Sequence, residues 1–498
     1  MFSIGENMSK QYDVIVIGSG IGGLTAASLL SKHKKVLVLE KNHVFGGYCA
    51  DFKRGAFRFE SAVQAINGLY KSNPVYKILK KANALDNLVI IKPKDLYRSI
   101  FPDYDINVPQ GNIRKYLNLL CSLFPNEKNG LINLFSKFKS IYTEMERFYN
   151  EKSLKKSPLI LRYGRRSLEE LLDEFIKDKK LKAIISQYWM YRGLPPSKIS
   201  AITFSYIWYD YTVNGSYFPR EGMYSIVKNL IAAIKRNGGD VIKDKGVLKL
   251  LAKNGQINEV ELNNYKRIGA RSFISNIDVL KTLGMVENIN PVDIEPFVKK
   301  IKKNTLYISA CKIYLGLSVD LRKLGISNYE IFVNPHYDVE KMYTDSFKNR
   351  FDNIPFFITV YSNLSGAFCS KTKSVVSIGF LSGYDYWRSF TREEYVKEKS
   401  RMTDIMIKRC EKIIPNISKY IEIKEAATPL TMERYTANSK GSVYGWNKKS
   451  IVEEINFMNP TTPIKNLFLS SHWTKMGGGI GGVLLVSDRV CDLLSKRA

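Results

Sequence analysis

Histidine and cysteine are scarce in this chain of 498 residues. It holds four histidines and six cysteines, and no two cysteines form a C-x-x-C pair. A metal centre built from several imidazoles needs more histidine than this, and a small secreted scaffold needs a higher density of cysteine. We therefore expect no metal site and no disulfide framework, and a reducing, cytoplasmic location fits best.

A long hydrophobic segment is also missing. The longest uncharged run extends from Val14 to Leu30, and glycines at positions 18, 20, 22 and 23 interrupt it. A transmembrane helix needs about 20 consecutive apolar residues, and clustered glycines disfavour one. The run therefore needs another explanation, which the glycine spacing supplies.

Acidic residues are outnumbered by basic ones. Lys+Arg 76 against Asp+Glu 47 gives a formal net charge of +29, which favours contact with a polyanion or an anionic surface. No zinc-ligand spacing or helix-turn-helix pattern accompanies the charge, so we expect no nucleic-acid partner. An anionic membrane surface, with the protein attached peripherally, is the predicted partner, and a merely solvated basic surface is the alternative. The basic segments are Lys152–Lys156, Arg162–Arg166, Lys177–Lys182 and Lys299–Lys303.

A β-branched run from Tyr12 to Ile17 leads directly into Gly18-Ser19-Gly20-Ile21-Gly22-Gly23. The spacing G-x-G-x-x-G between a strand and a helix is typical of dinucleotide-binding units. Gly18 permits the tight turn, Gly20 lets the backbone approach a pyrophosphate, and Gly23 lets the helix pack closely on the strand. We predict a helix over residues 24–31 whose amino end faces the phosphates.

Glu40 ends a second predicted strand, residues 35–40, at close to the spacing that such units require. A carboxylate at this point accepts hydrogen bonds from the adenosine ribose and disfavours a 2′-phosphate. The nucleotide is therefore predicted to be FAD or NAD rather than NADP.

Two further glycine-rich segments resemble a known family. Gly46 and Gly47 follow Glu40, and near the carboxyl end the segment 467–474 precedes the glycine-rich segment 477–483. Both resemble the FAD-dependent amine oxidase-like superfamily of two-dinucleotide-binding-domain flavoproteins. The resemblance implies FAD as the cofactor and an α/β fold, in which a Rossmann-like FAD-binding domain carries an inserted α+β substrate domain.

Internal segments resemble one branch of that superfamily, the phytoene desaturases, carotenoid isomerases and retinol saturases. These segments are Phe218–Met223, Thr428–Thr436 and Tyr444–Trp446. The resemblance implies an FAD-dependent oxidoreductase, a desaturase, isomerase or saturase, that acts on a long apolar polyene or isoprenoid lipid by hydride transfer at flavin N5. A flavin amine oxidase acting on a soluble amine and a non-catalytic flavin-binding, membrane-associated protein are the alternatives.

The same resemblance implies a set of FAD-binding residues. The glycines and the acid already described belong to this set. The resemblance also implies that the backbone of Val247 contacts the adenine and that the start of the last helix contacts the flavin. The set is Gly18, Gly20, Ile21, Gly22, Gly23, Glu40, Lys41, Gly46, Gly47, Tyr48, Val247, His472, Trp473, Gly479, Ile480 and Val483.

Glu221 and His472 are the predicted catalytic residues, because a carboxylate and an imidazole can both exchange protons near a flavin. Both stand where this chain departs from the branch: Glu221 replaces a usual glycine, and His472 replaces a frequent aspartate. A solvated loop glutamate and a histidine that only hydrogen-bonds the cofactor are the alternative interpretations.

The motifs divide the chain into interleaved segments. The FAD-binding domain is predicted to comprise residues 11–70, 239–277 and 465–498, and the substrate domain residues 71–238 and 278–464. Short strands around the Asn254-Gly255 turn are predicted within the middle FAD segment. The sequence carries no signal for an oligomeric state.

Two patterns concern the substrate domain. The apolar alternation that includes Ala310 changes phase near Cys311-Lys312, which predicts a β-bulge or a change of the buried face. The segment 188–218 is rich in aromatic residues, most of which we expect in the core, with a minority lining a tunnel for an apolar substrate. Its aromatic residues are Tyr188, Trp189, Tyr191, Phe204, Tyr206, Trp208, Tyr209, Tyr211, Tyr217 and Phe218.

Overall fold

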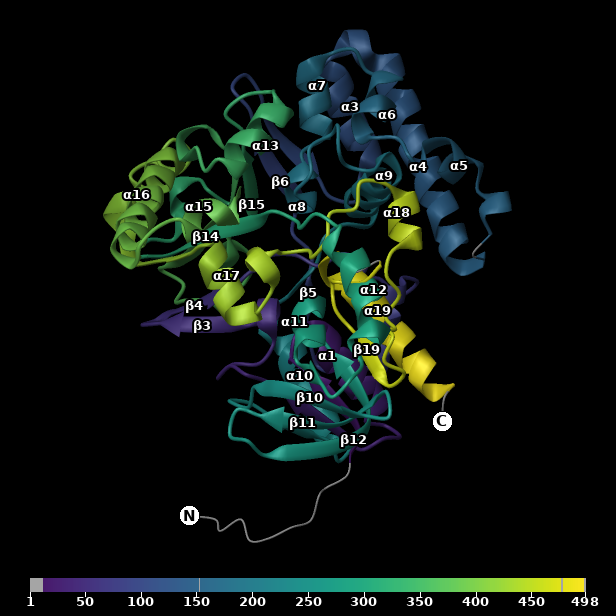
Figure 1. Ribbon diagram of the computed structural model, residues 1–498. Helices are drawn as coiled ribbons and strands as arrows, with labels where there is room; N and C mark the ends of the chain where they lie inside the picture. Colours follow the sequence, from purple (N-terminus) through teal and green to yellow (C-terminus); the bar gives the residue numbers. More distant parts are fainter. Residues whose placement is uncertain (1–11, 152, 476–477, 497–498) are drawn as a thin grey trace.

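The structure is a computed structural model that describes residues 12–151, 153–475 and 478–496 (Figure 1). Lys152 of the first basic segment and Gly477 of the carboxyl-terminal motif lie outside the described residues. One large sheet lies near the amino terminus, a second sheet lies at the opposite end, and a cluster of helices lies beside the second sheet (Figure 1). No helix within the described ranges is long and apolar enough to cross a membrane.

The first sheet collects strands from the beginning, middle and end of the chain. Its central strands are parallel, and the long strand β12 pairs with β1 and β19 along its second half and with the antiparallel strand β11 along its first half. The order is β9 (Asp240–Ile242), β2 (Val36–Leu39), β1 (Tyr12–Ile17), β12 (Arg267–Ser275), β11 (Gln256–Leu262), β10 (Val247–Lys253) and β13 (Val286–Glu287), with β19 (Leu467–Leu469) on β12. Each predicted FAD-domain segment thus contributes strands to this one sheet.

Both faces of the parallel strands are buried, as their continuous β-branched sequences require. Val14 and Val16 face the core formed with the helices, whereas Ile15 and Ile17 face the opposite core. The helix α1 (Ile21–Leu30) lies on the first face and packs against α10 (Tyr224–Arg236) and α19 (Gly479–Ser495). The second core contains α11 (Val279–Gly284) and α12 (Pro291–Lys302).

The second sheet is antiparallel except where β15 pairs with β6. Its strand β14 pairs with β17 in one unbroken register past Cys311 and Lys312, so the predicted bulge at this point is wrong. The phase of the apolar pattern changes because β14 is buried on both faces. The order is β18 (Ile421–Ala427), β14 (Ser309–Leu317), β17 (Ser374–Ser382), β16 (Phe356–Val360), β15 (Glu330–Val333), β6 (Asp95–Ile100) and β7 (Asp105–Pro109).

The remaining helices complete the molecule. A helical cluster packs beside the second sheet around buried aromatic residues such as Phe138, Phe204 and Trp208. It contains α3 (Ile113–Leu123), α4 (Lys128–Glu151), α5 (Pro158–Tyr163), α6 (Leu168–Asp173), α7 (Lys179–Ile185), α8 (Trp189–Arg192) and α9 (Ala201–Tyr209). Elsewhere lie α2 (Pro74–Lys81), α13 (Val339–Phe347), α14 (Tyr361–Leu364), α15 (Tyr384–Arg388), α16 (Arg392–Cys410), α17 (Pro429–Thr436), α18 (Ile451–Asn456) and the ribbons β3 (Asp51–Arg54) with β4 (Phe57–Glu60) and β5 (Ile90–Ile91) with β8 (Phe218–Pro219).

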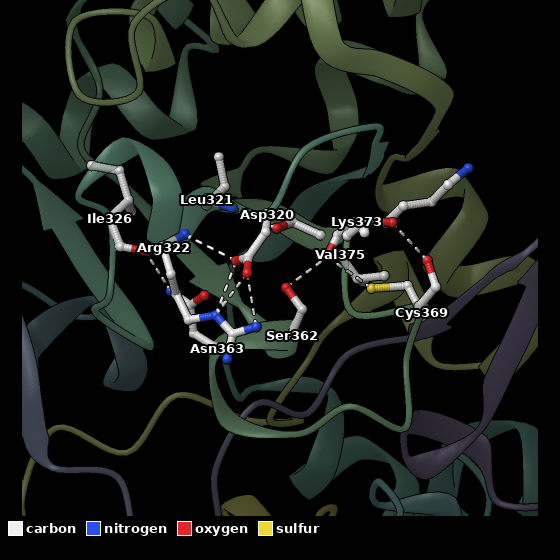
Figure 2. Close-up of polar contacts among 12 residues, drawn as sticks. Asp320, Leu321, Arg322, Ile326, Ser362, Asn363, Cys369, Lys373 and Val375 are labelled. Atoms are coloured by element: carbon white, nitrogen blue, oxygen red, sulfur yellow. Dashed lines mark hydrogen bonds and ion pairs between the residues drawn. The ribbon is translucent and has the colours of Figure 1, made fainter.

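A polar cluster fixes the loops that follow β14 and precede β17 (Figure 2). The Asp320 carboxylate accepts a hydrogen bond from the backbone N–H of Arg322 at 3.1 Å and from its guanidinium Nη2 at 2.9 Å. The Asn363 amide donates to the carbonyl of Ile326 at 2.8 Å. Burial raises the pKa of the neighbouring Cys369 to about 11, so this cysteine stays a thiol at neutral pH. The cluster supplies hydrogen-bond partners to backbone groups of these loops and therefore has a structural role.

Gly379 in β17 offers a test of how tightly the second sheet packs. A Cβ atom at this position would lie 2.3 Å from Cζ of Phe357. We predict that Gly379→Ala lowers the free energy of unfolding by about 1–3 kcal/mol, because the ring must give up its packed contacts with Tyr191 and Phe332. Gly269→Ala in β12 is the matched control, since its Cβ would meet no atom closer than 3.5 Å. Urea-induced unfolding measures both variants, and equal losses of stability in the two would contradict this packing.

Candidate active site

A cavity of about 880 Å³ extends between the first sheet, the second sheet and the helical cluster. Its nucleotide arm is lined by residues near the first sheet: Gly18, Ser19, Gly20, Ile21, Gly22, Glu40, Lys41, Gly46, Gly47, Tyr48, Val247 and Asn276. Its apolar arm is lined by residues of the second sheet and the helices: Met190, Tyr191, Ile207, Tyr211, Tyr307, Phe357, Phe380, Leu381, Tyr444 and Ile451. The two arms belong to one continuous cavity.

The glycine turn after β1 leaves no room for side chains. Gly18 has a φ of 90°, which favours glycine. A Cβ at Gly20 would lie 2.3 Å from Oδ1 of Asn276, and one at Gly23 would lie 2.4 Å from the carbonyl oxygen of Gly18. Gly23 does not line the cavity. Its missing side chain instead lets α1 lie close to β1.

Two helices begin at the cavity without a side-chain cap. Gly20 precedes α1 and Gly478 precedes α19, and neither helix has an acidic residue in its first turn. The first turns, which include Ile21 and Ile480, line the cavity. Uncapped N–H groups and the positive ends of the helix dipoles favour anionic ligand atoms, such as those of a pyrophosphate.

Glu40 is fixed at the edge of the nucleotide arm. Its Oε2 accepts hydrogen bonds from the backbone N–H and the hydroxyl of Ser19, at 2.9 and 2.6 Å. Its Oε1 accepts from the backbone and side-chain amides of Asn42, both at 2.9 Å. A buried, oriented carboxylate beside Val247 suits an adenosine ribose, so the glycine turn, the helix ends and the acid together fit FAD.

The structure separates His472 and Trp473, two neighbouring residues that the resemblance places at FAD. His472 lines the cavity and is partly buried, and its buried Nε2 has no hydrogen-bond partner within the described residues. Burial, with a smaller effect of Lys448, lowers its pKa to about 3, which favours a neutral hydrogen-bonding role over proton transfer. Trp473 is fully buried outside the lining, and its indole N–H donates to Asn438 at 3.1 Å. The structure therefore gives the side chain of Trp473 a place in the core rather than on the wall of the cavity.

The catalytic prediction for Glu221 is wrong. Glu221 is exposed and does not line the cavity. Its carbonyl accepts a hydrogen bond from Nη2 of Arg58 at 2.8 Å, and the turn continues through Gly222 at a φ of 85°. A solvated glutamate at the surface cannot exchange a proton with a ligand inside the cavity.

Sequence reasoning missed a buried group of ionisable residues beside the apolar arm. Lys312 on β14 lines the cavity, and its ammonium donates to the carbonyl of Ala62 at 3.0 Å and to the hydroxyl of Tyr361 at 3.1 Å. Burial lowers its pKa to about 7, against the opposing effects of Glu60 and Glu330. Burial likewise raises the pKa of Glu60 to about 8 and that of Glu330 to about 7. A group of this kind can hold or release a proton at neutral pH.

A signal for this group was present in the sequence. Lys312 interrupts a run of apolar residues at the point where the alternation changes phase, and Glu330 directly precedes Ile331-Phe332-Val333. Charged residues inside strand-like apolar runs are rare unless they are paired. Their pairing partners lie far away in the sequence, which concealed the site.

The aromatic segment divides as expected. Tyr188, Trp189, Phe204, Trp208 and Phe218 are buried in the core. A minority of these aromatic residues line the cavity: Tyr191, Tyr206 and Tyr211.

The chain belongs to the family of flavin containing amine oxidoreductases, whose model matches residues 21–494. It is thus a flavin-dependent oxidoreductase, and the predicted FAD cofactor and Rossmann-like flavoprotein fold are confirmed. An oxidoreductase from Methanosarcina mazei shares this fold with a TM-score of 0.65 and 16% identity, over 96% of this chain and 100% of the other.

Curated relatives confirm the predicted branch of the family. An all-trans-retinol 13,14-reductase of Danio rerio is 25% identical, over 96% of this chain and 85% of its own length. A chloroplastic prolycopene isomerase of Daucus carota is 26% identical, over 89% and 73%. A 1-hydroxycarotenoid 3,4-desaturase of Flavobacterium sp. (strain P99-3) is 24% identical, over 96% and 98%.

The uncapped start of α1 gives a test of FAD binding. An acid at the first helical position stabilises a helix but repels a phosphate at the same place. We predict that Ile21→Asp weakens FAD binding by about tenfold relative to Ile21→Asn, a difference on the order of 1–2 kcal/mol, without lowering the melting temperature of the FAD-free protein. Flavin fluorescence titration measures the affinity. Equal affinities of the two variants would place the pyrophosphate away from this helix end.

Proposed function

We propose that this protein is an FAD-dependent desaturase, saturase or isomerase of a long polyene or isoprenoid lipid. The continuity of the apolar arm with the nucleotide arm carries this proposal, because it lets an apolar chain reach the flavin without crossing water. The substrates named for the curated relatives, a retinol, a prolycopene and a hydroxycarotenoid, support the same class of compound.

The walls of the apolar arm suit such a substrate. Tyr307 and Tyr444 meet edge to face, with ring centroids 5.2 Å apart, and Tyr191 meets Phe357 in the same way at 6.2 Å. Aromatic rings held in this manner form a rigid apolar wall. Met190, on the same arm, is a flexible apolar side chain that can adapt to an irregular ligand.

The chemistry divides between cofactor and protein. Bound FAD supplies hydride transfer at N5, and the chain orients the reacting bond, excludes water and handles protons. In desaturation a C–H bond of the lipid gives up a hydride, and in saturation a C=C bond receives one. A soluble amine as substrate, or no turnover at all, are the competing outcomes.

The substrate class can be tested by rapid mixing. We predict that anaerobic mixing of the oxidised holoenzyme with a desaturable polyene bleaches the flavin, or that a polyene reoxidises the photoreduced flavin. Simple amines are predicted to do neither, because most side chains that line the apolar arm are aromatic or aliphatic and bind a small charged molecule poorly. Flavin absorbance measures each half-reaction, and product analysis of the prereduced enzyme covers isomerisation. Bleaching by amines alone would overturn the proposal in favour of an amine oxidase.

A charge placed in the apolar arm should act on the lipid alone. Ile207 lines this arm. We predict that Ile207→Asp lowers kcat/KM for the polyene by at least about tenfold and leaves FAD affinity unchanged, because a lipid cannot compensate a buried carboxylate. Ile207→Leu is the control and should retain most of the activity. If Ile207→Asp reacts like the control, the lipid occupies another channel.

We also propose that the protein attaches to an anionic membrane through α5 and its flanks. Leu161 is 66% exposed on α5, and the exposed basic residues Lys155, Arg162 and Arg165 surround it in sequence. The following Gly164 packs against α18, whose Ile451 lines the apolar arm. An apolar tip with a basic rim, next to the wall of the lipid cavity, suits uptake of substrate from a bilayer.

Charge reversal tests this attachment. We predict that Lys155→Glu/Arg165→Glu lowers partition onto phosphatidylserine vesicles about 30-fold at low salt, from about 1 kcal/mol for each basic residue lost. Lys299→Glu/Lys300→Glu, a matched reversal on the exposed side of α12, should change partition less. Co-sedimentation at low and high salt measures both, since salt screens the attraction. Equal effects of the two reversals would attribute binding to net charge rather than to α5.

A further inference from the structure

Tyr191 connects the apolar arm to a buried acid. It lies on α8, its ring lines the cavity, and its hydroxyl donates a hydrogen bond to Oε1 of Glu330 on β15. The rings of Tyr188 and Phe332 hold it in place, with centroid distances of 5.5 and 5.4 Å. Packing against these rings therefore fixes the hydroxyl toward Glu330.

Glu330 lies behind this tyrosine. It is 5% exposed and does not line the cavity, so Tyr191 links it to a ligand there. The groups that interact electrostatically with Glu330 are Lys312 and a shell of buried tyrosines, and Lys312 also interacts with Glu60. Burial raises the pKa of each of these tyrosines, so they remain neutral: Tyr97, Tyr188, Tyr191, Tyr211, Tyr329 and Tyr361.

We propose that Tyr191 is the catalytic residue that exchanges a proton with the lipid, and that Glu330 stores this proton beside Lys312. The proposal rests on the proposed function and deepens it, because it assigns the proton that accompanies the hydride. His472 and Glu221 do not compete for the role: one is a neutral imidazole, and the other is at the surface.

The step balances in both directions. In saturation, one alkene carbon receives a hydride from the reduced flavin, and the other receives the proton of Tyr191 as its O–H bond breaks. The Tyr191 oxygen takes the carboxyl proton of Glu330 in the same event, because a separate tyrosinate is unfavourable where burial raises the tyrosine pKa. The resulting Glu330 carboxylate lies near the Lys312 ammonium and is later reprotonated from solvent. Desaturation follows the reverse path, with oxidised flavin taking the hydride.

The relay restricts the chemistry. Saturation and desaturation each move one proton together with one hydride, whereas isomerisation moves no net proton. A pocket that holds a tyrosine in contact with a titrating carboxyl is therefore built for saturation or desaturation. Lys312 acts as a positioning residue, since its charge favours the carboxylate form of Glu330 and opposes the rise in pKa that burial causes.

The pH dependence follows from the value of about 7 for the pKa of Glu330. Saturation needs the protonated carboxyl, so its single-turnover rate is expected to fall as pH rises through about 7. Desaturation needs the carboxylate, so its rate is expected to rise over the same interval. In Glu330→Gln this limb of the profile should disappear in either case.

Three measurements on the holoenzyme test the relay. Without substrate, infrared difference titration should show a carboxyl band that disappears near pH 7, that is absent in Glu330→Gln and that shifts in Tyr191→Phe, where its hydrogen bond is lost. In single turnovers with a reactive polyene, Tyr191→Phe should slow the step by at least about 100-fold without changing FAD affinity. Saturation in D2O should place a solvent deuterium on the carbon that receives the proton of Tyr191.

Tyr209→Phe is the matched control, because Tyr209 belongs to the same aromatic segment but lies on α9, outside the lining of the cavity and outside the tyrosines around Glu330. It should react at the rate of the unmodified protein. The relay is overturned if Tyr191→Phe reacts within about threefold of this control, or if the pH dependence persists in Glu330→Gln. Polyene turnover would still support the proposed function in either case. If no polyene reacts, the proposed function fails and the relay fails with it.

Discussion

The close approach of α1 to β1 is the constraint on which the rest of the structure depends. It requires glycine at position 23, where a Cβ would lie 2.4 Å from the carbonyl oxygen of Gly18. Because α1 lies close to the sheet, α10 and α19 can both pack against it. The strand β19, from the far end of the chain, pairs with β12 in the same sheet. The contact between α1 and β1 also aims the uncapped end of α1 at the nucleotide arm, so the packing that builds the core also builds the cofactor site.

A second constraint lies where the two sheets meet at the cavity. Lys312, Glu60 and Glu330 come from three separate strands and are all buried. Burial of one cation near two carboxyl groups is tolerated because their charges offset one another and because a carboxyl group can take up a proton. The same three residues, by sharing charge and protons in a buried place, also provide an exchangeable proton beside the apolar arm.

The positions of the basic residues in the fold narrow the interpretation of the net positive charge. A net charge of +29 alone favours any polyanion. The folded chain gathers an exposed leucine and several basic residues at α5, next to the helix α18 that lines the apolar arm. Surface charge thus lies close to a wall of the apolar arm, which composition cannot reveal.

The sequence by itself determined the nucleotide site, because the determinants are local. The turn from Gly18 to Gly23, the acid at Glu40 and the start of α19 each depend on residues close together in the chain, and all of them except Gly23 line the cavity. The positions of Glu221 and Trp473 outside the cavity lining did not follow from the sequence, because turn geometry and core packing decide where a side chain points. Only the tertiary structure brought Tyr191 to Glu330 and Lys312, since the energy of a buried charge depends on partners that are distant in sequence.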